Sequence, residues 1–105
     1  MKRILVALGI AVVILPLAAT AQQDTPSAGL MRAMEKTQKS MPKPTGDVDR
    51  DFAAMMIVHH KGAIDMANVL LERGKDAGLK KMAKKMIGDQ TKEIKQLESH
   101  LAKQK

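Results

Sequence analysis

Two long stretches of helical periodicity, separated by a short connector, constrain this chain more than any other feature. Apolar residues recur every three or four positions over residues 52–70 and again over residues 79–101, which is the spacing of one face of an α-helix. Residues 74–78 between them are short enough that the second helix must turn back against the first. No segment has the alternation of a β-strand, so we predict an all-α fold built on an antiparallel helical hairpin.

Local signals place the helix ends. Ser27 is the expected N-cap of a short Met-rich helix that runs to about residue 40, where the Pro-rich connector 41–46 stops it. Acidic residues open the second helix at about residue 47, and Gly74 is the expected left-handed C-cap after residue 73. The third helix is expected from residue 77 or 79 to residue 102.

The first 21 residues have the pattern of a secretory signal peptide. Lys2 and Arg3 form a basic start, an uncharged apolar run follows over residues 4–17, and Ala19 and Ala21 are spaced as at a small-x-small cleavage site. An uncleaved anchor is the alternative, although the apolar run is short for a membrane span. We expect a periplasmic or secreted protein with a leader, short helix and connector over residues 22–46 and a hairpin domain over residues 47–105.

Composition excludes several classes of function. The chain has no Cys, so zinc fingers, iron–sulfur clusters and Cys nucleophiles are excluded. One Phe and no Trp or Tyr leave no aromatic platform for single-stranded nucleic acid. The motifs of zinc proteases, phosphate-binding loops and Ser/His/Asp catalysis are also missing, so we expect neither nucleic-acid binding nor enzymatic activity.

Paired histidines in a Met-rich helix are the main functional signal. Seven residues of the second helix share one face on a helical wheel: Phe52, Met55, Met56, His59, Ala63, Met66 and Leu70. Thioethers suit Cu(I) and, by extension, Ag(I), and imidazole suits both copper oxidation states. The sequence predicts a copper site, with Cu(I) favoured, at Met55, Met56, His59, His60, Met66 and Glu93. The alternatives are a structural role for His59 in the core and an exposed imidazole at His60.

The third helix places two polar residues, Gln90 and Glu93, on its expected inner face. That face otherwise carries apolar residues, among them Leu79, Met82 and Met86, so each polar group needs a partner. We expect Glu93 to hydrogen-bond His59 and so to orient the imidazole as a ligand. Five lysines occupy the opposite side and predict a solvated face: Lys81, Lys84, Lys85, Lys92 and Lys95. Whether Met82, Met86 and His100 contribute ligands stays open.

These residues resemble a known bacterial family, the domain of unknown function 305. The resemblance is carried by Phe52-x-x-Met55-x-x-x-His59-His60-x-Gly62-Ala63-Ile64-x-Met66-Ala67 and by the later Gln90-x-x-Glu93-Ile94, and it covers residues 47–101. The family consists of ferritin-like helical domains, usually exported, and includes a copper-resistance protein. The resemblance therefore implies a ferritin-like bundle and periplasmic copper binding through Met and His. A Met and then a Trp often follow the Glu-Ile pair in the family, whereas this chain has Leu97 and His100 at those places.

The resulting hypothesis is an exported protein that sequesters or delivers copper without catalysis. We expect it to form a homo-oligomer that completes a four-helix or larger bundle, and to have a periplasmic copper-handling partner. One alternative is a helical interaction module without metal, whose Met-rich surface docks a partner helix. A vestigial ferritin-like redox enzyme is a third possibility.

Overall fold

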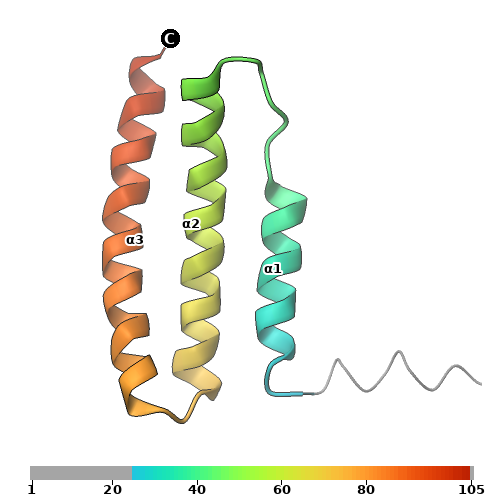
Figure 1. The fold of residues 1–105 in the computed structure, drawn as a ribbon, viewed down its shortest axis with the longest axis vertical. Helices are drawn as coiled ribbons and strands as arrows, with labels where there is room; N and C mark the ends of the chain where they lie inside the picture. Colours follow the sequence, from blue (N-terminus) through green and yellow to red (C-terminus); the bar gives the residue numbers. More distant parts are fainter. Residues whose placement is uncertain (1–24, 105) are drawn as a thin grey trace, which may run out of the picture.

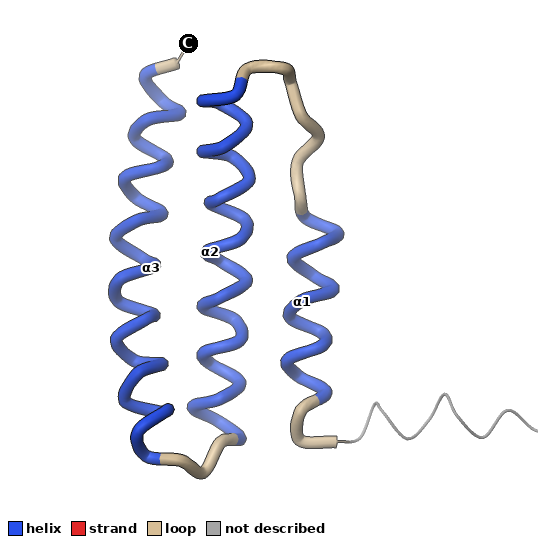
Figure 2. Tube along the Cα trace, viewed as in Figure 1, coloured by secondary structure: helices blue, strands red, loops and turns tan. Residues whose placement is uncertain are grey.

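Three α-helices make up the fold. The computed structural model describes residues 25–104, with α1 at Ala28–Ser40, α2 at Val48–Arg73 and α3 at Ala77–Lys103 (Figures 1 and 2). No strand occurs in this part of the chain, so the all-α prediction is confirmed. None of the three helices is long and apolar enough to span a membrane. The predicted signal peptide lies outside the described residues.

The helices lie side by side in a row, with α2 in the middle. Helix α2 contacts both α1 and α3, whereas α1 and α3 make no contact with each other within residues 25–104 (Figure 1). The α2–α3 hairpin has the predicted antiparallel arrangement, and α1 runs antiparallel to α2 along its other side (Figure 2). The structure is therefore one layer of helices rather than a closed bundle.

Acidic side chains fix the starts of both long helices. Asp47 caps α2 by accepting a hydrogen bond from the Arg50 amide at 3.1 Å, and Asp76 caps α3 by accepting one from the Leu79 amide at 2.7 Å. Asp51 reaches back to the connector, where it accepts bonds from the Thr45 hydroxyl at 2.7 Å and from the amides of Thr45 and Gly46. Gly46 has φ of +97°, a left-handed conformation that favours glycine. Hydrogen bonds to Asp51, in the first turn of α2, thus fix the connector that precedes this helix.

Ser27 and Gly74 occupy the predicted cap positions of α1 and α2, but neither has the predicted cap geometry. Ser27 precedes α1, but its side chain makes no capping hydrogen bond; its carbonyl accepts from the Leu30 amide instead. Gly74 follows α2 with extended backbone, φ −74° and ψ 161°, rather than the predicted left-handed cap. The short connection explains the second difference, because an extended residue leads directly from α2 to the Asp76 cap of α3.

The buried residues are mostly small. Among the described residues the buried apolar side chains are Ala28, Ala33, Ala53, Ile57, Ala67, Ala83 and Ile94. Small residues also bring α1 close to α2, since a β-carbon on Gly62 would lie 2.1 Å from Thr37 Oγ1. The helices therefore approach closely but enclose little apolar volume.

Part of the expected inner face of α3 is uncovered, although Ala83 and Ile94 are buried as predicted. Leu79, Met82 and Met86 are 49%, 59% and 44% exposed, so the prediction that they point into the core of the hairpin is wrong. In a single layer, each helix buries only the residues that contact the adjacent helix. Leu79, Met82 and Met86 lie next to those residues and stay exposed. The five lysines of α3 are exposed, as predicted.

Candidate metal centre

A buried histidine joins α2 to α3. His60 is 7% exposed, and its Nε2 is bonded to Oε2 of Glu93, whose side chain is 54% exposed. The two residues are 33 positions apart, so this pair fixes the alignment of the two helices near the middle of the hairpin. The predicted carboxylate–imidazole pair exists, but it uses His60 rather than His59.

The rotation of α2 accounts for this correction. Neighbouring residues on a helix are about 100° apart, so His59 and His60 cannot both face α3. His60 faces α3, together with the buried Ala53 and Ile57. His59 is exposed, with its ring centre 6.1 Å from that of His60 and the two rings edge to face. The wheel face that contains His59 and Met66 lies beside the α2–α3 contact: Met66 lines a depression together with residues of α3, whereas His59 is exposed.

A pocket lies beside the His60–Glu93 pair. It is lined by Phe52, Met56, His60, Glu93, Gln96, Leu97 and His100. Three of the predicted site residues, Met56, His60 and Glu93, therefore meet there, and His100 joins them. Of the remaining predicted ligands, Met66 lines a different depression, and neither Met55 nor His59 lines this pocket. The sequence contained a signal for His100, since it follows Glu93 by seven residues, two helical turns along one side of α3.

The second ring nitrogen of His60 is the unusual atom of the site. Nδ1 is buried and has no hydrogen-bond partner within the described residues. An ionised carboxylate only accepts hydrogen bonds, so a neutral imidazole that donates from Nε2 to such a group carries its lone pair on Nδ1. Metal-binding histidines have this arrangement, in which one nitrogen donates to a carboxylate and the other is free to coordinate. The geometry provides a held imidazole with one unused donor.

A metal site at His60 would need a sulfur ligand in addition to nitrogen and oxygen ligands. Within residues 25–104 no three His, Asp or Glu side chains come together closely enough to hold a metal ion. The pocket adds the thioether of Met56 to the imidazoles of His60 and His100. A mixed sulfur and nitrogen donor set of this kind suits a soft ion.

Comparison with known families agrees with the motifs quoted above. The family model described as Domain of unknown function (DUF305) matches residues 14–101. The chain belongs to the DUF305 family. The match takes in α1 as well as the hairpin, and so extends beyond the resemblance found by residue motifs. No curated protein matches this DUF305 chain.

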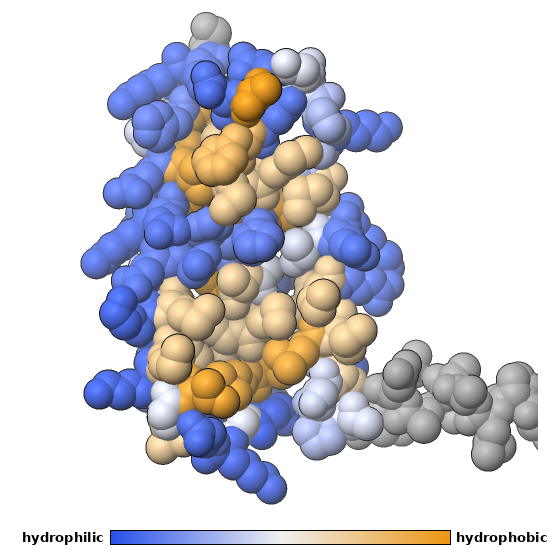
Figure 3. Space-filling view, in the orientation of Figure 1, coloured by the Kyte–Doolittle hydropathy of each residue, from blue (hydrophilic) through white to orange (hydrophobic). Residues whose placement is uncertain are grey.

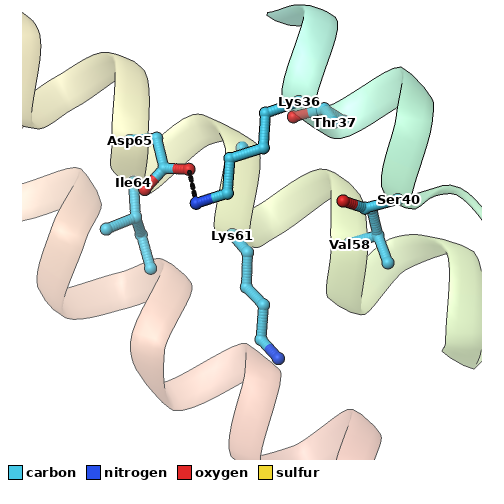
Figure 4. Close-up of a pocket in the computed structure, with 8 residues that line it drawn as sticks. Lys36, Thr37, Ser40, Val58, Lys61, Ile64 and Asp65 are labelled. Carbon is cyan, nitrogen blue, oxygen red and sulfur yellow. Dashed lines mark hydrogen bonds and ion pairs between the residues drawn. The ribbon is translucent and has the colours of Figure 1, made fainter. Parts of the chain in front are cut away.

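A second pocket of the DUF305 chain lies between α1 and α2. Figure 4 shows Lys36 of α1 directed at Asp65 of α2, with Nζ 3.3 Å from Oδ2, while Lys61 extends away from that pair. Lys36 and Asp65 are both substantially exposed, so the ion pair adds little stability. The pocket is lined by aliphatic parts of side chains and by one ion pair. The sequence analysis did not predict it.

An apolar depression lies near the end of the hairpin where α2 connects to α3. All three helices of the DUF305 chain contribute to it: Leu30 from α1, Ala63, Met66, Ala67 and Leu70 from α2, and Leu79, Met82, Ala83 and Met86 from α3. Its three methionines are the predicted Met66 and the two α3 residues whose part in the site the sequence left open. No polar side chain lines it, so it offers sulfur without imidazole or carboxylate.

Proposed function

We propose that this DUF305 protein binds copper, with Cu(I) favoured, and sequesters or delivers it after export to the periplasm. Copper is the cargo in this proposal, and the protein carries out no catalysis. The observation that carries the proposal is that Met56, the buried His60 and His100 line one pocket. Family membership supports the proposal, because the resemblance stated above implies copper binding for relatives.

The chemistry of the residues fits a soft ion. The unpartnered Nδ1 of His60 is a donor held in place, and the thioether of Met56 and the imidazole of His100 line the same pocket. Thioether donors favour Cu(I) over Zn²⁺ or Mg²⁺, and Ag(I) shares this preference. Cu(II) is accommodated by imidazole more readily than by sulfur.

Glu93 has a positioning role in this proposal. Its carboxylate is bonded to Nε2 of His60, which fixes the orientation of the ring. Of the ligands predicted from the sequence, the proposal keeps Met56 and His60, because both line the pocket, and it adds His100. Met55, His59 and Met66 lie outside the pocket.

Competition titration tests the proposal. The processed protein, recovered after export, is titrated with Cu(I) under anaerobic conditions against a chromophoric chelator. We expect Met56→Leu and His100→Ala to weaken Cu(I) binding by about tenfold or more, and Glu93→Gln to weaken it by about 10–100-fold. Two matched controls outside the pocket, Met31→Leu and His59→Ala, should leave the affinity unchanged. Equal affinities for the pocket and control variants would reject this site.

The exposed methionines favour a second candidate, an interaction module without metal. Leu79, Met82 and Met86 form a surface of the kind that docks a helix. Failure of the processed wild-type protein to compete with the chelator would favour this function over copper binding. Bound iron with turnover of peroxide or oxygen would instead favour a redox enzyme.

A further inference from the structure

We infer that a second copy of this chain covers the apolar depression between the three helices. We call this surface the open face, and its larger side chains are Leu30, Met66, Leu70, Leu79, Met82 and Met86. Two copies stacked through their open faces would form a two-layer bundle of six helices. The inference does not depend on copper, because the open face contains none of the proposed ligands.

The first argument is that one layer of helices leaves the fold without a closed core. Helix α2 has neighbours on two sides only, and α1 and α3 do not touch within the described residues. No large side chain among them is completely buried. A chain of this size without disulfides has few other means of stabilisation, so cover from a partner has a large effect.

The second argument is the continuity of the open face. Figure 3 shows an apolar area that extends over all three helices near the α2–α3 connection. Contiguous apolar surface of this kind marks an interaction site more often than scattered exposed residues do. Leu79, Met82 and Met86 are each 44% to 59% exposed, so a partner that covers them removes apolar surface from water. Burial of these large apolar side chains would stabilise a complex formed through the open face.

Charge and symmetry are both compatible with a second copy as the partner. The precursor has a formal charge of +7, which would repel an identical chain, but no charged residue lines the open face. Lys81, Lys84 and Lys85 of α3 are exposed and do not line this face. Because α2 is the middle helix, a two-fold contact centred on it would place α2 against α2 of the second copy. The outer helices would then cover each other, as an isologous interface requires.

Measurement of mass in solution tests the inference. The processed protein is studied by light scattering and sedimentation equilibrium in the presence of a metal chelator, so that copper plays no part in the result. We expect a dimer for the wild type. Met82→Lys introduces a charge on an exposed residue of the open face and should give a folded monomer. The matched control is Met31→Lys, since Met31 is 66% exposed on α1 outside this face, and it should remain dimeric.

Single cysteines provide a second readout, because the chain has no Cys of its own. Ala63→Cys lies on the middle helix within the open face, whereas the exposed Asn68 lies about 140° further around α2. Oxidation should join two copies through Ala63→Cys but not through Asn68→Cys. A wild-type monomer with intact helical circular dichroism would overturn the inference, as would a dimer that Met82→Lys leaves unchanged. A monomer whose open face is covered by retained residues 4–17 would also overturn it.

Discussion

The backbone of Gly62 in α2 lies directly against the side chain of Thr37 in α1. A β-carbon on Gly62 would be 2.1 Å from Thr37 Oγ1 and 3.2 Å from its Cβ and Cγ2, so Gly62→Ala must displace the Thr37 side chain or move the two helices apart. Overpacking of this kind costs about 1–3 kcal/mol, which outweighs the gain of roughly 1 kcal/mol from replacing glycine in a helix. We predict a lower free energy of unfolding in urea, and a variant as stable as the wild type would contradict this contact.

A second substitution at Thr37 should reverse this loss. Thr37→Ala removes Oγ1 and Cγ2, so Gly62→Ala in that background should cost less than it does in the wild type. The resulting double-mutant cycle measures the coupling of the two positions. Gly88→Ala is a matched control, since nothing lies within 4 Å of its added β-carbon. It should stabilise the protein by up to about 1 kcal/mol.

The His60–Glu93 pair should contribute to stability as well as to the proposed site. Glu93→Gln removes the charge from the acceptor of the buried imidazole. Since the carboxylate is half exposed, we expect a loss of only about 1 kcal/mol in urea denaturation. Glu98→Gln, an exposed carboxylate of the same helix, serves as the control and should change stability by less. Equal effects of the two substitutions would show that the pair adds nothing specific.

Asp51 should make the connector before α2 sensitive to acid. The Thr45 hydroxyl and then the Thr45 amide hydrogen-bond its carboxylate, which lowers the pKa of Asp51 below its ordinary value of 3.8. A lowered pKa in the folded state stabilises the protein above the ordinary value, and this contribution is lost as the pH falls through the folded pKa. We predict that Asp51→Asn lowers the Tm at neutral pH and that the difference from wild type shrinks below pH 3.8. A Tm difference between the variant and the wild type that does not change with pH would show that ionisation of Asp51 is not its cause.

The periodicity of apolar residues predicted the three helices and the hairpin, because the spacing of each helix is a local property. It did not predict how far α2 is rotated about its axis. His59 and His60 are neighbours, so a rotation of about 100° decides which of them meets Glu93. The pattern also marked Leu79 and Met82 as residues that avoid water without showing what would cover them. Ligand chemistry pointed to Met56, and the need of a polar group on an apolar face for a partner pointed to Glu93. Whether His100 takes part stayed open until the pairing of α2 and α3 was seen.

The position of α1 at one edge of the row has a consequence for the order in which the chain folds. Three residues separate α2 from α3, so the hairpin consists of contacts that are near in sequence and form rapidly. Because α2 is the one helix that α1 contacts within residues 25–104, α1 can join afterwards and can open without disturbing the hairpin. Met56, His60, Glu93 and His100 all belong to α2 and α3. A newly made chain would therefore bring these four side chains together before its first helix has docked.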